Sequence, residues 1–117
     1  MKIIIKTKNL ELTASLENLI NKKMDGLKKF IGILKGKSAE VFVEVEKETK
    51  HHRKGDIFKS EAILQLPGKK LVARAHGEDV AKAIVEVKEE LEREIRKYKS
   101  KMIEIPRRQA QKFKQEV

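Results

Sequence analysis

The chain has 117 residues, a formal net charge of +10, and a charged share of 39% that is well above the roughly 25% typical of soluble proteins. This length fits one domain with its own core, and the positive excess favours a polyanionic partner, nucleic acid first and an anionic membrane surface second. The absence of cysteine excludes disulfides and thiolate chemistry, and no apolar run approaches the ~20 residues that span a bilayer.

The N-terminal segment begins MKIIIKTKNLEL, and its apolar run before Lys6 is too short for a signal peptide. We therefore expect an intracellular, cytoplasmic protein. Residues 2–8 are rich in β-branched side chains and predict a strand. Thr13 is the expected N-cap of a helix that ends near Gly36 and includes Gly26. The apolar positions of this helix recur at steps of three and four: Leu16, Leu19, Ile20, Met24, Leu27, Ile31 and Leu34.

Three alternating segments follow, at residues 39–48, 57–66 and 70–76, and each predicts a strand with one apolar face. The apolar faces comprise Val41, Val43 and Val45, then Phe58, Ala62, Leu64 and Leu66, then Leu71, Ala73 and Ala75. Residues 67–69, PGK, predict a short hairpin connection. Residues 47–56, KETKHHRKGD, predict a longer polar loop.

A second, long helix is predicted after Gly77, with Asp79 as its N-cap. Its apolar stripe comprises Val80, Ile84, Val87, Leu91, Ile95, Tyr98 and Met102. Pro106 is expected to end the helix by about Ile105. We therefore expect a single α/β domain over residues 1–105 and a basic, flexible C-terminal tail over residues 106–117.

The predicted order is β-α-β-β-β-α, an α+β fold of two layers with a four-stranded sheet and two helices packed on one face. The first β-α-β unit is expected to pair its strands in parallel, and the remaining strands to form an antiparallel meander.

Cations concentrate on the outer faces of the two predicted helices. Lys22, Lys28 and Lys29 point away from the core on the first helix, with Lys23 at the boundary. Lys82, Arg93, Arg96 and Lys97 lie opposite the apolar stripe of the second. Helix stability accounts for part of this charge, since acid at a helix start and base at its end complement the dipole, and Glu89–Arg93 and Glu92–Arg96 have i,i+4 spacing. It does not account for four further cations beyond the helix: Arg107, Arg108, Lys112 and Lys114. We infer a surface that binds phosphates.

The sequence offers no catalytic, metal or cofactor site. His51 and His52 lie in a polar loop, and His76 is distant from them in the sequence, so no spacing for metal ligands is present. No serine has an evident His–Asp relay that would make it a nucleophile. Residues 32–38, GILKGKS, have too short a spacing for a phosphate loop and predict a helix end instead. Phe42 is a lone exposed aromatic, whereas sheets that stack single-stranded bases use paired aromatics. We expect no enzyme and no small-molecule substrate.

Two segments carry a family resemblance: LTASLENLINKKMDGLKKF at 12–30 and LVARAHGEDVAKAIVEVKEELEREIRKYKSK at 71–101. In this order they resemble the ribosome hibernation promoting factor and ribosome-associated inhibitor family, also called the sigma-54 modulation protein family, over residues 1–101. The resemblance implies a protein that binds 16S-type ribosomal RNA in the decoding region of the small ribosomal subunit. It would block the channel of messenger RNA and of transfer RNA in the A and P sites.

The resemblance implies that basic residues on both helices contact ribosomal RNA. The candidates are Lys22, Lys23, Lys28, Lys29, Lys82, Lys88, Arg93, Arg96, Lys97, Lys99 and Lys101. The chain is similar to the short form of the family, which lacks the ribosome-pairing domain, so we expect a monomer off the ribosome. It departs from the family where Val80 and Ala81 replace a usual Met-Tyr.

Three alternatives remain open: a protein-interaction module that modulates transcription, a generic binder of double-stranded RNA, and a binder of anionic membranes. The last is disfavoured because the apolar stripes of both helices are committed to the sheet. Co-sedimentation with small subunits separates the leading hypothesis from the first, and binding to naked duplex RNA identifies the second.

Overall fold

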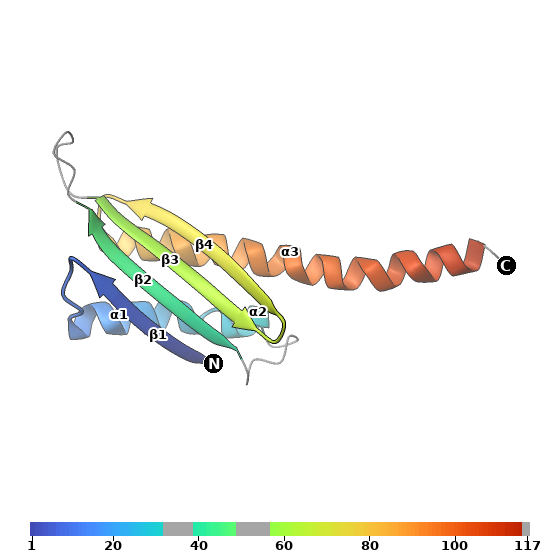
Figure 1. Ribbon diagram of the computed structural model, residues 1–117, viewed down its shortest axis with the longest axis horizontal. Coiled ribbons are helices and arrows are strands. Elements are labelled where there is room, and N and C mark those ends of the chain that lie inside the picture. The colour runs from blue at the N-terminus through green and yellow to red at the C-terminus, as the bar shows by residue number, and fades with distance from the viewer. Residues whose placement is uncertain (32–38, 49–56, 116–117) are drawn as a thin grey trace.

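The computed structural model describes residues 1–31, 39–48 and 57–115, the last fourteen of these by their backbone only. The elements in chain order are β1 (Lys2–Lys8), α1 (Ala14–Asp25), α2 (Lys28–Ile31), β2 (Glu40–Glu48), β3 (Ile57–Leu66), β4 (Lys69–Gly77) and α3 (Val80–Gln115). Figure 1 shows one sheet with all three helices behind it. The predicted two-layer α+β fold is confirmed.

The four strands form one mixed sheet in the order β1-β2-β3-β4. β1 pairs with β2 in parallel, and the pairs β2–β3 and β3–β4 are antiparallel. The predicted crossover and meander are therefore both correct. β3 and β4 are joined by Pro67 and Gly68, and Gly68 has a φ of 74°, a left-handed conformation that favours glycine.

The core lies between the sheet and the helices, because strand residues alternate between a covered and an uncovered face. The valines at 41, 43 and 45 are buried, as predicted, against fully buried helix residues that include Ile20, Met24, Ile84, Leu91 and Ile95. Ser60 is also buried here, and its hydroxyl donates a hydrogen bond to the carbonyl of Ala83 at 2.7 Å. This bond ties β3 directly to the start of α3.

Both predicted N-caps are present. The Oγ1 atom of Thr13 accepts a hydrogen bond from the backbone N–H of Leu16 at 3.2 Å, and Oδ1 of Asp79 accepts one from the N–H of Lys82 at 2.8 Å. Each bond satisfies a backbone donor that has no partner within its own helix.

The first helix is shorter than predicted. α1 ends at Asp25 with Gly26 as its C-cap, and the separate turn α2 begins at Lys28. The apolar spacing does not reveal this break, because Met24, Leu27 and Ile31 remain buried on both sides of it. The expected stop at Gly36, the segment 32–38 and most of the loop 47–56 lie outside the described residues.

The predicted end of the second helix at Ile105 is wrong, since α3 continues through Pro106 to Gln115. Proline removes one backbone hydrogen bond and crowds the preceding turn, but the helix continues on both sides of it. α3 extends well beyond the edge of the sheet (Figure 1). That residues 106–117 form a flexible tail outside the domain stays a prediction.

Candidate nucleic-acid interface

The outer surface of the helical layer carries most of the predicted site residues. α1 and α3 run in the same direction across the back of the sheet, as the colour gradient in Figure 1 shows. Lys22 and Lys23 lie in the last turn of α1, whereas the predicted cations from Arg93 to Lys101 lie in the middle of α3. Cations of different elements are brought together where α2 lies beside the middle of α3.

The predicted residues differ in exposure. The exposed ones are Lys22, Lys28, Lys29, Lys82, Arg93, Arg96, Lys97 and Lys101, and the half-buried ones are Lys23, Lys88 and Lys99. None of these eleven cations is buried, so all can reach a partner in solvent.

Phe30 joins the cations of α2 to those of α3. The Nζ atom of Lys29 lies 5.2 Å from the centroid of its ring, and Cζ of Arg96 lies 5.3 Å from the same centroid. Phe30 is half-buried and packs against the core. Cations at these distances are attracted to an aromatic ring, by roughly 0.5–1 kcal/mol at exposed sites. The ring thus holds a lysine and an arginine from two separate elements on one surface.

Lys88 lies where α1 ends against α3. A Cβ atom at Gly26 would be 3.2 Å from the Nζ atom of Lys88, so the amine sits directly over the C-cap of α1. A cation is favoured there by the negative end of the helix dipole. Lys88 also forms an ion pair with Glu92, with Nζ and Oε1 3.4 Å apart. Its contribution is therefore partly structural.

The two i,i+4 ion pairs predicted on α3, Glu89–Arg93 and Glu92–Arg96, are not among the pairs that form in the described residues. Arg93 pairs with Glu90 rather than Glu89, and the Nζ of Lys97 lies 3.6 Å from Oε1 of Glu94. Lys28, the first residue of α2, pairs with Asp25, the last residue of α1, with Nζ and Oδ1 2.7 Å apart. These pairs are largely solvent-exposed, and such pairs contribute only about 0–1 kcal/mol. A phosphate can therefore compete for each of these cations at low cost.

Other cations on this surface have no carboxylate partner within the described part of the chain, namely Lys22, Lys29, Lys82 and Arg96. They are not all close together. Lys82 lies in the first turn of α3, whereas Arg96 lies 14 residues further along the same helix, roughly 21 Å away along its axis, beside Phe30. The cluster that the structure brings together is centred on Phe30, and sequence analysis did not assign a role to this residue. Its position directly after Lys28 and Lys29 is the signal that could have found it.

The family comparison decides the identity of the chain. The model of the family described as sigma 54 modulation protein / S30EA ribosomal protein matches residues 3–103. The chain belongs to this family. The resemblance found in the sequence is confirmed, and the family is one of non-enzymatic modulators that associate with ribosomes.

Solved structures support the fold. A ribosomal subunit interface protein from Coxiella burnetii is similar with a TM-score of 0.69 at 20% identity, covering 86% of this chain and 99% of that one. The N-terminal domain of Protein Y from Thermus thermophilus gives a TM-score of 0.62 at 20% identity, covering 84% and 99%. No curated protein sequence matches the chain.

The two residues that replace the expected Met-Tyr lie at the start of α3. Val80 packs partly against the core and Ala81 is exposed.

In the described residues, no helix is both long and apolar enough to cross a membrane.

Proposed function

We propose that this protein inhibits translation by binding the small ribosomal subunit through the outer surface of α1, α2 and α3. The surface would lie against 16S-type ribosomal RNA in the decoding region and block the channel of messenger RNA and of A- and P-site transfer RNA. Membership of a ribosome-associated family supports the partner. The name of one similar structure, a ribosomal subunit interface protein, agrees with it.

The observation that carries the proposal is the convergence of Lys29 and Arg96 on Phe30. It joins the cations of two helical elements into one surface that can contact neighbouring phosphates. Each lysine or arginine that neutralises a phosphate releases condensed counterions, which favours binding at low salt. Inhibition then needs no catalysis, because a folded domain in the channel excludes other ligands by volume and charge.

Sucrose-gradient co-sedimentation with purified small subunits tests the proposal. We expect the wild-type protein to migrate with the subunits and to be released at high salt. The variant R93E/R96E/K97E, reversed on α3, is expected to remain at the top of the gradient. The matched control is K2E/K8E/K70E, which changes net charge equally on the uncovered sheet face and is expected to co-sediment.

Circular dichroism of both variants must first show a folded domain. Co-sedimentation of R93E/R96E/K97E at the wild-type level would contradict the assigned surface. Equal affinity for naked duplex RNA and for small subunits would identify a generic double-stranded RNA binder instead.

We also propose that the protein is a monomer off the ribosome. Sedimentation equilibrium of the free protein checks this state.

A further inference from the structure

The sheet face that the helices leave uncovered carries one apolar row from edge to edge. Ile4 on β1 pairs with Phe42, Phe42 with Ile63, and Ile63 with Val72 on β4. Phe42 and Val72 keep 38% and 41% of their surface exposed. The rows on either side are polar: Lys2, Glu40, Gln65 and Lys70, and then Lys6, Glu44, Glu61 and Arg74.

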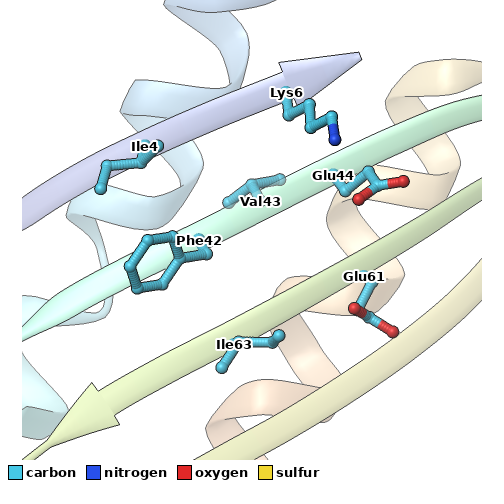
Figure 2. A pocket seen from close by; sticks show the side chains of 7 residues that line it. All are labelled: Ile4, Lys6, Phe42, Val43, Glu44, Glu61 and Ile63. Carbon is cyan, nitrogen blue, oxygen red and sulfur yellow. The ribbon is translucent and has the colours of Figure 1, made fainter. Parts of the chain in front are cut away.

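A hollow of about 170 Å³ lies where the apolar row meets the second of these polar rows. Figure 2 shows Ile4, Phe42 and Ile63 on one side of it and the charged groups of Lys6, Glu44 and Glu61 on the other. Pockets for whole small molecules usually measure roughly 300–1,000 Å³. The hollow therefore fits one side chain of a partner rather than a complete small ligand.

The two carboxylates beside the hollow face each other across neighbouring strands. Glu44 pairs in register with Glu61, and like charges directly opposite each other destabilise a sheet. Glu61 is compensated by Arg74, whose Nε lies 2.6 Å from Oε2. Glu44 has no ion pair in the part of the chain that the structure describes. Lys6 is in register with Glu44, and Lys59 lies beside both carboxylates, so these lysines offset part of the repulsion without an ion pair to Glu44. A cation from a partner in contact with both carboxylates would reduce the repulsion further.

The charge pattern does not suit a second copy of this chain. Consider two copies packed with their open sheet faces together and related by a two-fold axis parallel to the strands. Glu44 of one copy would then oppose Glu61 of the other, and Lys6 would oppose Arg74. If the two-fold axis instead ran parallel to the apolar row, across the strands, Glu40 of one copy would oppose Glu44 of the other. Both symmetric arrangements place like charges together. Nucleic acid is also disfavoured at this position, because the carboxylates repel phosphates.

We propose that this hollow binds an arginine side chain presented by a protein partner. The guanidinium stacks on the exposed ring of Phe42, and its N–H groups donate to the carboxylates of Glu44 and Glu61. Ile4 and Ile63 contact the apolar side chains next to that arginine. The site lies on the opposite side of the sheet from the helical cations, so it is independent of the proposed RNA binding and both surfaces can be occupied together.

A titration followed by ¹H–¹⁵N NMR spectra tests the site with a defined probe, the peptide Ac-Val-Arg-Val-NH₂. We expect saturable shifts of the amides of Phe42, Glu44, Glu61 and Ile63, with a dissociation constant on the order of tens of millimolar, as suits one exposed ion pair and one stacking contact. The control peptide replaces arginine with citrulline, which has the same shape and no charge. It is expected to cause no saturable shift.

Variants then separate the two contacts. E44Q and F42L are each expected to weaken peptide binding by about threefold or more. E40Q is the matched control, because Glu40 is on the same strand and face but outside the hollow, and it is expected to bind as the wild type does. The dispersion of the same spectra shows whether each variant is folded.

Four outcomes would overturn the proposal: no saturable shift with the arginine peptide, equal shifts with the citrulline peptide, shifts centred on α2 and α3, or equal loss of binding in E40Q and E44Q. An oligouridine that shifts the same amides would assign the hollow to RNA instead. Concentration-dependent shifts at these amides without any peptide would assign it to a second copy.

Discussion

Gly77 connects the last strand to the long helix, and its missing side chain fixes how closely they approach. A Cβ atom there would lie 2.8 Å from the backbone nitrogen of Ala83 and 3.1 Å from the carbonyl oxygen of Asp79. Both neighbours are backbone atoms of the segment that begins α3, and they cannot move without displacing the helix. Gly26 is different, because one of its nearest atoms is the mobile end of the Lys88 side chain, at 3.2 Å.

We therefore predict that G77A destabilises the protein by about 1–3 kcal/mol, the usual cost of forcing extra atoms into a packed region. G26A is the matched control and is expected to change the free energy of unfolding by less than about 1 kcal/mol, because only the end of the Lys88 side chain and the carbonyl of Lys23 must adjust. Urea unfolding followed by circular dichroism measures both. Equal stability of the two variants would show that the start of α3 can shift freely.

At the level of elements, the sequence predicts what depends on local chemistry. Alternation at Val41, Val43 and Val45 identifies a strand and its buried face, and the caps at Thr13 and Asp79 mark where helices begin. The breaks were harder to predict. The turn at Gly26 keeps the apolar spacing intact, and Pro106 costs one hydrogen bond within a helix that otherwise continues.

The candidate surfaces depend on contacts between elements, which no local pattern contains. The outward direction of the helical cations follows from the 3.6-residue period, so their exposure could be predicted. The meeting of Lys29 and Arg96 on Phe30 could not, because it requires the packing of α2 against α3. The row from Ile4 to Val72 likewise requires the register of every strand pair.

The length of α3 leads to a prediction about its C-terminal part. Its 36 residues correspond to about 54 Å of helix, most of the 66 Å long axis of the molecule. Among the side chains of α3 that the structure describes, up to Lys101, the last buried core residue is Ile95, and Tyr98 packs against the core. Deleting residues 106–117 is therefore expected to change the free energy of unfolding by less than about 0.5 kcal/mol.

The same deletion removes four cations: Arg107, Arg108, Lys112 and Lys114. We hypothesise that this segment reaches into the messenger path, so the truncated protein should bind small subunits more weakly and inhibit translation less. Co-sedimentation and an in vitro translation assay measure the two effects. Unchanged affinity and unchanged inhibition would count against the hypothesis.

The whole molecule has two faces with different charge patterns. The helical face presents cations that are unpaired or held in weak exposed pairs. On the open face of the sheet, the central strands carry Lys59 and carboxylates that include Glu40, Glu44, Glu46 and Glu61, while the cations Lys2, Lys6, Lys8, Lys70 and Arg74 lie on the two edge strands. The net charge of +10 therefore does not act uniformly, and we expect the cations around Phe30 on the helical face to suit phosphates better than the open sheet face, where cations and carboxylates are mixed.

This asymmetry predicts different salt dependences for two variants of equal net charge. For binding to small subunits, the logarithm of the association constant should fall linearly with the logarithm of salt concentration, with a slope of roughly −0.7 to −0.9 per neutralised phosphate. R93Q/R96Q/K97Q should make this slope shallower by about two to three, because the proposed function has Arg93, Arg96 and Lys97 each neutralise a phosphate. K2Q/K8Q/K70Q loses the same charge from the open sheet face and should keep the wild-type slope. Filter binding across a series of salt concentrations measures each slope. If both variants flattened the slope equally, overall charge would drive binding, and the helical face would have no special role.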